Sequence, residues 1–225
     1  ATGTLKLVRN LSSYEIFKQV NILNKESQKK YNRSLTNIVY MGMGEPLLNY
    51  KNVLKSIENI TSTDGMNISA KRITVSTAGL PKMIIKLADD NIRFNLAISL
   101  HSAIEETRSL IMSINKSNGL EDLKKSIQYF YKNTGKRITY EYILFEKIND
   151  DIRAAQKLSE FCKISPCKVN LIEYNKIDQT SYLKSSRSQT KKFISFLEDK
   201  NIIVNLRRSR GKDIDAACGQ LVNKS

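Results

Sequence analysis

Short apolar runs rich in β-branched residues alternate along the chain with longer segments whose apolar residues recur at helical spacing. The short runs predict strands at 37–41, 72–76, 94–100, 137–145, 168–174 and 201–206. The longer segments predict helices at 12–30, 50–60, 81–90, 120–133, 150–163 and 188–200. Because the predicted strands are too apolar to have a face in water, the alternation favours an α/β fold with helices covering a parallel sheet. That sheet is either a barrel or an open doubly wound sheet.

Three of the predicted helices begin at residues suited to a helix start. Ser12 and Glu15 resemble a capping box, and Pro81 fits a first helical turn. The run 149–151, Asn-Asp-Asp, supplies capping side chains for the helix at 150–163. These signals support the boundaries given by the periodicity.

The chain has 225 residues, of which 40% are hydrophobic, and no linker rich in Pro, Gly or Ser divides it. We therefore expect one domain over residues 1–225. No apolar run approaches the roughly 18 residues of a membrane span, and residues 1–6 lack the features of a signal peptide. We expect a cytoplasmic monomer with no membrane partner. Because the first residue is not Met, we also expect a domain truncated at its N-terminal end.

The formal net charge of +15 favours a polyanionic partner, since basic side chains release counterions when they bind phosphates. Lysines spread evenly along the chain are equally explained by ordinary solvated positions. Arginine is the rarer cation here, and Arg207, Arg208 and Arg210 form a cluster. We expect these three arginines to contact nucleic acid.

Polar or flexible residues follow four of the predicted strands. They are Gly44 and Glu45 after the first strand, Ser76 at the end of the second, 99–101 (Ser-Leu-His) at the end of the third and Asn175 after the fifth. The carboxyl ends of parallel strands meet at one edge of a sheet, so these residues are expected to form one composite site.

Each of these residues also has a structural explanation. Gly44 fits a tight turn, Ser76 and Ser99 fit helix caps, and the single histidine, His101, fits a hydrogen-bonded structural role. Glu45 is more specific, because Pro46 fixes a carboxylate beyond glycines that let a ligand approach the backbone. Such a carboxylate is suited to the amino group of a small zwitterion.

Three cysteines are too few for a disulfide framework. Cys162 and Cys167 have no nearby histidine or third thiol, and we expect them to be buried as small hydrophobic residues. Cys218 differs, because alanines and a glycine flank it and leave its sulfur accessible just after the arginine cluster.

Five motifs occur in a specific order: 42–47 Gly-Met-Gly-Glu-Pro-Leu, 76–79 Ser-Thr-Ala-Gly, 99–101 Ser-Leu-His, 167–172 Cys-Lys-Val-Asn-Leu-Ile and 210–221 Arg-Gly-Lys-Asp-Ile-Asp-Ala-Ala-Cys-Gly-Gln-Leu. The ordered set resembles the RlmN and Cfr family of adenine methyltransferases over nearly the whole chain.

The resemblance implies the partial (β/α) barrel of radical S-adenosylmethionine enzymes. It implies that S-adenosylmethionine is bound by Gly44, Glu45, Ser76, Ser99, Leu100, His101 and Asn175. It also implies that Cys218 is the residue that becomes methylated.

In this family, one S-adenosylmethionine methylates the cysteine. A second is cleaved reductively at a 4Fe-4S cluster, which receives its electron from an electron donor. The radical formed activates the S-methyl group, which adds to adenine, and another cysteine resolves the adduct. The resemblance implies methylation of carbon 2 of adenine in 23S ribosomal RNA and possibly transfer RNA. Cfr-type methylation of carbon 8 is the alternative within the family.

The family holds its cluster with a Cys-x3-Cys-x2-Cys motif directly before a sequence like Ala-Thr-Gly, and this chain starts at 1–3, Ala-Thr-Gly. The resemblance thus implies that the cluster ligands, the resolving cysteine and an upstream acid precede residue 1 in the full-length enzyme, so we expect no metal ligand in this chain.

Two other classes remain open. One is a truncated, non-catalytic relative that only binds RNA. The other is a different β/α-barrel enzyme that acts on an anionic small molecule, with the arginine cluster as its phosphate site.

Overall fold

The computed structural model of the chain describes residues 8–41, 44–176 and 181–208. Its strands are β1 (Ile38–Tyr40), β2 (Ile73–Thr77), β3 (Asn95–Ser99), β4 (Ile138–Leu144), β5 (Cys167–Glu173) and β6 (Val204–Arg207). Its α-helices are α1 (Ser13–Tyr31), α2 (Tyr50–Thr61), α3 (Pro81–Asp89), α4 (Glu105–Ile111), α5 (Leu120–Thr134), α6 (Ile152–Cys162) and α7 (Arg187–Glu198). Short 3-10 helices are η2 (Pro46–Asn49), η3 (Ala70–Arg72) and η4 (Ser113–Lys116).

The predicted alternation of strands and helices is confirmed, with two differences. Helix α4 was not predicted, because a helix of 7 residues is too short to show a helical period. The last strand begins at Val204 rather than at residue 201, because residues 199–202 still bond to the end of α7 and Asn201 has a left-handed φ of 58°. The spacing of apolar residues in the sequence shows neither a helix this short nor the exact residue at which a strand begins.

The strands follow chain order in a sheet ordered β1-β2-β3-β4-β5-β6. Parallel pairing is found for β1 with β2, β3 with β4, β4 with β5, and β5 with β6. The chain divides into two compact units, and the boundary passes through β3. Among the described residues, the N-terminal unit comprises 8–41, 44–77 and 92–96, and the C-terminal unit comprises 78–91, 97–176 and 181–208.

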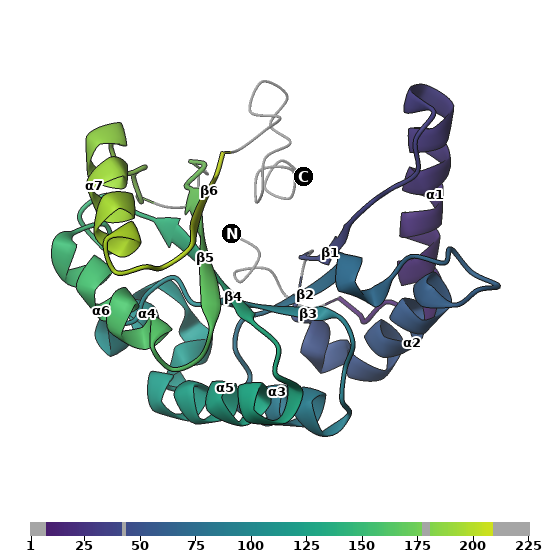
Figure 1. Cartoon of the computed structure of the whole chain (residues 1–225), viewed down its shortest axis with the longest axis horizontal. Helices are drawn as coiled ribbons and strands as arrows, with labels where there is room; N and C mark the ends of the chain where they lie inside the picture. Colours follow the sequence, from purple (N-terminus) through teal and green to yellow (C-terminus); the bar gives the residue numbers. More distant parts are fainter. Residues whose placement is uncertain (1–7, 42–43, 177–180, 209–225) are drawn as a thin grey trace. The chain divides into compact units, whose positions relative to one another are not determined.

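In the N-terminal unit, the pair β1 and β2 is covered by α2, whose buried face includes Val53, Ile57 and Ile60. The Tyr40 hydroxyl on β1 lies 2.8 Å from the Ser56 hydroxyl on α2, which ties the strand to the helix. Helix α1 lies against α2 and buries none of its own residues (Figure 1). The capping box predicted at the start of α1 is confirmed.

In the C-terminal unit, helices pack on one face of β4. Tyr140 makes an edge contact with Phe161 of α6, with ring centroids 5.4 Å apart, and Tyr142 lies 5.5 Å from Phe193 of α7. Helices α3 and α5 run side by side (Figure 1) and their buried residues include Leu87. Each large apolar side chain buried in this way contributes roughly 1.5–3 kcal/mol.

Arg108 on α4 is fully buried and joins the segments that follow β2 and β3. Its guanidinium donates to the carbonyl of Ala78 at 2.8 Å and to the carbonyl of Leu100 at 3.2 Å, and it also donates to the Asn115 side chain. Burial lowers the pKa of Arg108 to about 10, while the nearby Glu105 raises it, so the group is charged at neutral pH. A buried cation thus donates to main-chain carbonyls of two segments that leave the sheet.

Gly79 is required next to this arginine. Its φ is +94°, and a Cβ there would come within 3.2 Å of both Arg108 Nη2 and Leu123 Cδ1. The close approach of this loop to Arg108 therefore depends on a residue without a side chain.

Asn149 is the second buried connector in the C-terminal unit. Its amide donates to the carbonyls of His101 at 2.7 Å and Ile143 at 2.8 Å, and its Oδ1 accepts from the Phe145 amide at 2.7 Å. The cap of α6 is Asp151, which accepts from the Ala154 amide at 2.7 Å. Of the run 149–151, Asn149 therefore fixes the segment after β3 while Asp151 caps the helix.

We predict that Arg108→Met strongly destabilises the protein. Methionine fills much of the space but removes the guanidinium donors to Ala78, Leu100 and Asn115, at a cost of about 3 kcal/mol or more. The free energy of unfolding, measured by denaturant titration of the full-length protein, should fall accordingly. The exposed Arg187→Met is the matched control and should change stability by less than about 0.5 kcal/mol. Equal stability of the two variants would contradict the role given to Arg108.

Candidate functional site

In the N-terminal unit, the predicted site residues lie after β1 and near the end of β2. The register of these parallel strands pairs Tyr40 with Val75, so their carboxyl ends share one edge. Gly44 has a φ of +82° with open space around its Cα, which suits a tight turn. Glu45 caps η2, since its Oε1 accepts from the Leu47 amide at 3.0 Å. Ser76 is buried, with 6% of its surface exposed.

In the C-terminal unit, the segment 99–101 leaves β3 at a defined angle. The amides of Leu100 and His101 both donate to the carbonyl of Glu141 on β4, at 3.0 and 3.2 Å. His101 has a left-handed φ of 56°, which turns the chain out of the sheet. Together with the bonds from Arg108 and Asn149, these contacts hold the predicted ligand-binding segment rigidly.

His101 is neutral at physiological pH. Burial and the nearby Arg108 lower its pKa to about 4. Its Nδ1 accepts a hydrogen bond from the Ile143 amide at 3.2 Å, so the single ring proton is on Nε2. The histidine therefore offers one hydrogen-bond donor to a ligand and no charge.

A row of polar side chains crosses the face of the sheet opposite the helices that contact Tyr140 and Tyr142. The strand register pairs Ser99 with Glu141, Glu141 with Asn170, and Asn170 with Asn205. Asn170 donates to Glu141 Oε1 at 2.9 Å, and Asn205 donates to Asn170 Oδ1 at 3.3 Å. We call Ser99, Glu141, Asn170 and Asn205 the polar row.

Glu141 and Asn170 were not among the predicted site residues. Both lie inside predicted strands, where an acid or an amide among β-branched residues is unusual. Alternation along β4 also places Glu141 on the face opposite Tyr140 and Tyr142. These polar residues inside strands are visible in the sequence. Their contact with each other could be inferred only once β4 and β5 were known to be neighbours.

Four buried side-chain oxygen atoms in the C-terminal unit have no hydrogen-bond partner among the described residues: Tyr140 Oη, Glu141 Oε2, Ser165 Oγ and Asn175 Oδ1. Tyr140 packs against α6, on the face opposite Glu141, so Glu141 and Asn175 are the two that concern the predicted site. Asn175 follows β5 and is 8% exposed, and Glu141 is 3% exposed. Buried acceptors without donors are costly in a folded protein, and they are expected where a ligand supplies the donors. S-adenosylmethionine carries ammonium, hydroxyl and amino donors, so these residues fit it.

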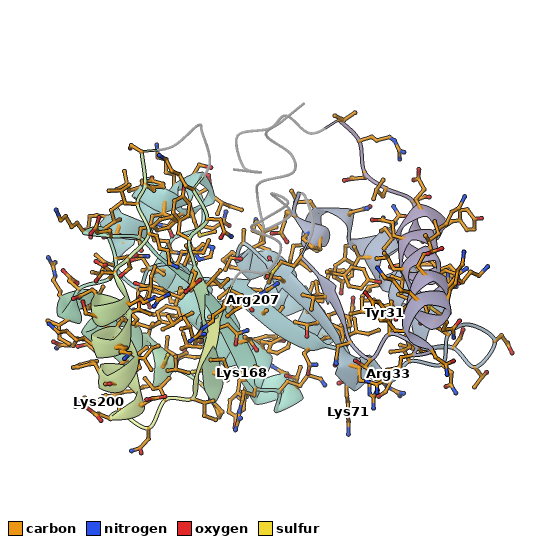
Figure 2. All side chains as sticks on the ribbon, turned by 90° about the horizontal axis from the view of Figure 1, so that it is seen from above. Tyr31, Arg33, Lys71, Lys168, Lys200 and Arg207 are labelled. Atoms are coloured by element: carbon orange, nitrogen blue, oxygen red, sulfur yellow. The ribbon has the colours of Figure 1, made fainter. Side chains whose placement is uncertain are left out.

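The predicted RNA contacts are only partly within the described residues. Arg207 is the exposed last residue of β6 (Figure 2). Arg208 follows it and is also exposed. Arg210 and the predicted methyl carrier, Cys218, lie outside the described residues. The placement of Arg207 at a strand end is compatible with contact to a large anionic ligand.

The other two cysteines have structural surroundings. Cys162 is buried, as expected, and Cys167 is partly exposed with its thiol donating to the Cys162 carbonyl at 3.6 Å. The hydrogen bond with Cys167 and burial raise the pKa of Cys162. Within the described ranges, no three or more His, Cys, Asp or Glu side chains are grouped to hold a metal ion. No described helix has both the length and the apolar composition needed to cross a membrane.

Comparison with curated proteins gives long matches, although no family model matches the chain. The chain is 52% identical over 224 residues to the probable dual-specificity RNA methyltransferase RlmN of Flavobacterium johnsoniae. It is 54% identical over 225 residues to the protein of the same name from Christiangramia forsetii. Each match covers 100% of this chain and 64% of the relative, so the chain spans less than two thirds of their length.

A solved structure confirms the fold. The chain superimposes on a radical SAM methyltransferase from Sphaerobacter thermophilus with a TM-score of 0.93 and 36% sequence identity. The match covers 97% of this chain and 64% of that one. The expected partial (β/α) barrel of the radical S-adenosylmethionine type is therefore confirmed. With these matches and its ordered motifs, the chain belongs to the RlmN family of radical S-adenosylmethionine RNA methyltransferases.

Proposed function

We propose that the full-length protein methylates carbon 2 of adenine in 23S ribosomal RNA and in transfer RNA, with Cys218 as the methyl carrier. The observation that carries this proposal is the identity of 52% over 224 residues to a probable dual-specificity RNA methyltransferase. The ordered motifs from residue 42 to residue 221 support it further. The products expected are 2-methyladenosine in both RNAs.

The chemistry of the target atom explains the need for a thiol. Carbon 2 of adenine is electron-poor and has no nucleophilic lone pair, so it does not attack a methyl sulfonium. A cysteine thiolate does: it forms a bond to the methyl carbon, the sulfonium bond breaks, and S-adenosylhomocysteine leaves. The thiol proton is lost before the attack, because the thiolate is the nucleophile. Cys218, flanked by Ala217 and Gly219, is the residue to which we assign this step.

We assign S-adenosylmethionine binding to residues at the carboxyl ends of the strands, namely Gly44, Glu45, Ser76, Ser99, Leu100, His101 and Asn175. In the C-terminal unit, the neutral His101 offers a donor from Nε2 and Asn175 offers a buried acceptor. Arg108 and Asn149 act as positioning residues, since they hold the main chain of 99–101 and do not themselves end in the site. A rigid site limits the loss of entropy on ligand binding.

The residues described here do not fit a 4Fe-4S cluster, because they contain no group of three suitable ligands. We place the cluster ligands in the part of the full-length relatives that this chain does not match. For the Flavobacterium johnsoniae protein, the match covers 64% and the unmatched part is the other 36%. We propose that the full-length enzyme also needs an electron donor and acts as a monomer.

We predict that Cys218→Ala in the full-length enzyme, reconstituted with iron and sulfide, abolishes RNA methylation while S-adenosylmethionine still binds. The measurement is mass spectrometry of nucleosides from 23S ribosomal RNA and transfer RNA. Cys162→Ala is the control and should retain methylation, because its thiol is buried against Cys167 and outside the site.

The same measurement distinguishes the possible products of the wild-type enzyme. Modification at carbon 2 supports the proposal, and modification at carbon 8 shows the other activity of the family. A Cys218→Ala variant that methylates as well as the wild type would contradict the role of this thiol.

We also predict that Arg207→Gln weakens RNA binding by removing one phosphate contact. The slope of the logarithm of the binding constant against the logarithm of salt concentration should become shallower by about 0.7–0.9. Lys200→Gln is the charge-matched control, since Lys200 is exposed after α7 and lies apart from Arg207 in the C-terminal unit (Figure 2). An unchanged slope for Arg207→Gln would remove Arg207 from the RNA interface.

A further inference from the structure

Glu141 is the acid whose burial the fold does not explain. It lies in the middle of β4 with 3% of its surface exposed, and carboxylates are seldom buried unless their charge is paired. Its Oε1 accepts from Asn170 at 2.9 Å, but its Oε2 has no hydrogen-bond partner among the described residues. An apolar residue at this position would avoid the desolvation cost, so the carboxyl group is expected to have a function.

The charges around Glu141 leave its second oxygen available. No ion pair to this carboxylate is present in the described part of the chain. Lys168 of β5 and Arg207 of β6 lie on neighbouring strands of the same unit (Figure 2) and act on it through their fields. Burial raises the pKa of Glu141, while the bond from Asn170 and these two cations lower it. The two cations stabilise the charge of Glu141 from a distance, but no residue in the described part of the chain donates directly to Oε2.

The position of Glu141 in the sheet indicates which class of molecule could supply this donor. The register places it beside Ser99, and its own carbonyl accepts from the amides of Leu100 and His101. Glu141 therefore lies at the same level of the sheet as the residues assigned to S-adenosylmethionine. With only 3% exposed, its side chain is too enclosed to meet a large RNA surface.

The chemistry of S-adenosylmethionine narrows the choice of donor. Its donors are the ammonium group, the two ribose hydroxyls and the adenine amino group. The ammonium group is expected to bind Glu45, whose carboxylate suits the amino group of a small zwitterion. In dinucleotide-binding folds an acidic side chain accepts a hydrogen bond from a ribose hydroxyl.

We propose that Glu141 is a substrate-binding residue whose Oε2 accepts a hydrogen bond from a ribose hydroxyl of S-adenosylmethionine. Asn170 holds the carboxylate in place through Oε1, and Asn205 in turn holds Asn170. The polar row thus fixes the angle at which the carboxylate meets the ribose. This inference rests on the proposed function, since it assumes that S-adenosylmethionine occupies the site.

The first test compares two variants of the full-length, cluster-loaded enzyme in equilibrium dialysis with labelled S-adenosylmethionine. Glu141→Gln should bind about tenfold more weakly, since a hydrogen bond to a charged acceptor is lost. Glu173→Gln removes the same charge from the neighbouring strand β5, where alternation places residue 173 on the opposite face from Asn170. This control should bind like the wild type. Thermal unfolding of each variant verifies that it is folded.

The second test uses the wild-type enzyme, so it tests the hydrogen bond to the ribose even if Glu141→Gln does not fold. The wild-type enzyme should bind the 2′-deoxy or the 3′-deoxy analogue of S-adenosylmethionine about tenfold more weakly than the parent compound. Glu141→Gln should show little further loss with that analogue, because the two changes remove the same bond.

The outcomes separate this inference from the proposed function. If the wild type binds S-adenosylmethionine but both deoxy analogues bind equally well, the role of Glu141 is overturned and the proposed function stands. Equal affinity of Glu141→Gln and the wild type has the same meaning. If the wild type binds no S-adenosylmethionine at all, the proposed function and this inference both fail.

Discussion

The buried guanidinium of Arg108 is the interaction on which the C-terminal unit of this chain depends. Strands end where their hydrogen-bonding partners end, so the segments after β2 and β3 leave carbonyls that must be satisfied in another way. Arg108 supplies donors to Ala78 and Leu100 from the inside, and Gly79 lets the loop come close enough. The segment 99–101, to which we assign ligand binding, is therefore held in place by contacts within the protein.

The other side of the same segment is held by β4. The Glu141 carbonyl accepts from two successive amides, Asn149 holds the carbonyl of His101, and the Ile143 amide fixes the ring of His101. The side chains left over, Asn175 and Glu141, each have a buried oxygen without a partner among the described residues. The protein itself thus holds the main chain of this segment, and we propose that the ligand supplies donors to these two oxygen atoms.

Much of this could be predicted from the sequence, and the rest depends on contacts between distant residues. The spacing of apolar residues predicted every strand and all the long helices. Buried positions are apolar, and they recur at the period of the strand or helix that they belong to. The spacing missed α4, which carries Arg108, since one short helix shows no period. Residues such as Asn149 and Glu141 could be seen but not interpreted, because their roles require the register of β4 with its neighbours. For Arg210 and Cys218, the assignment rests on motifs alone.

The central claim is that S-adenosylmethionine is bound at the carboxyl ends of these strands by groups that the fold holds ready. A crystal structure of the full-length enzyme with S-adenosylmethionine bound tests it most directly. The account predicts a ligand donor within hydrogen-bonding distance of Asn175 Oδ1 and another within that distance of Glu141 Oε2. It also predicts unchanged bonds from Arg108 to Ala78 and Leu100. A ligand bound elsewhere, with both oxygens still unpartnered, would contradict the account.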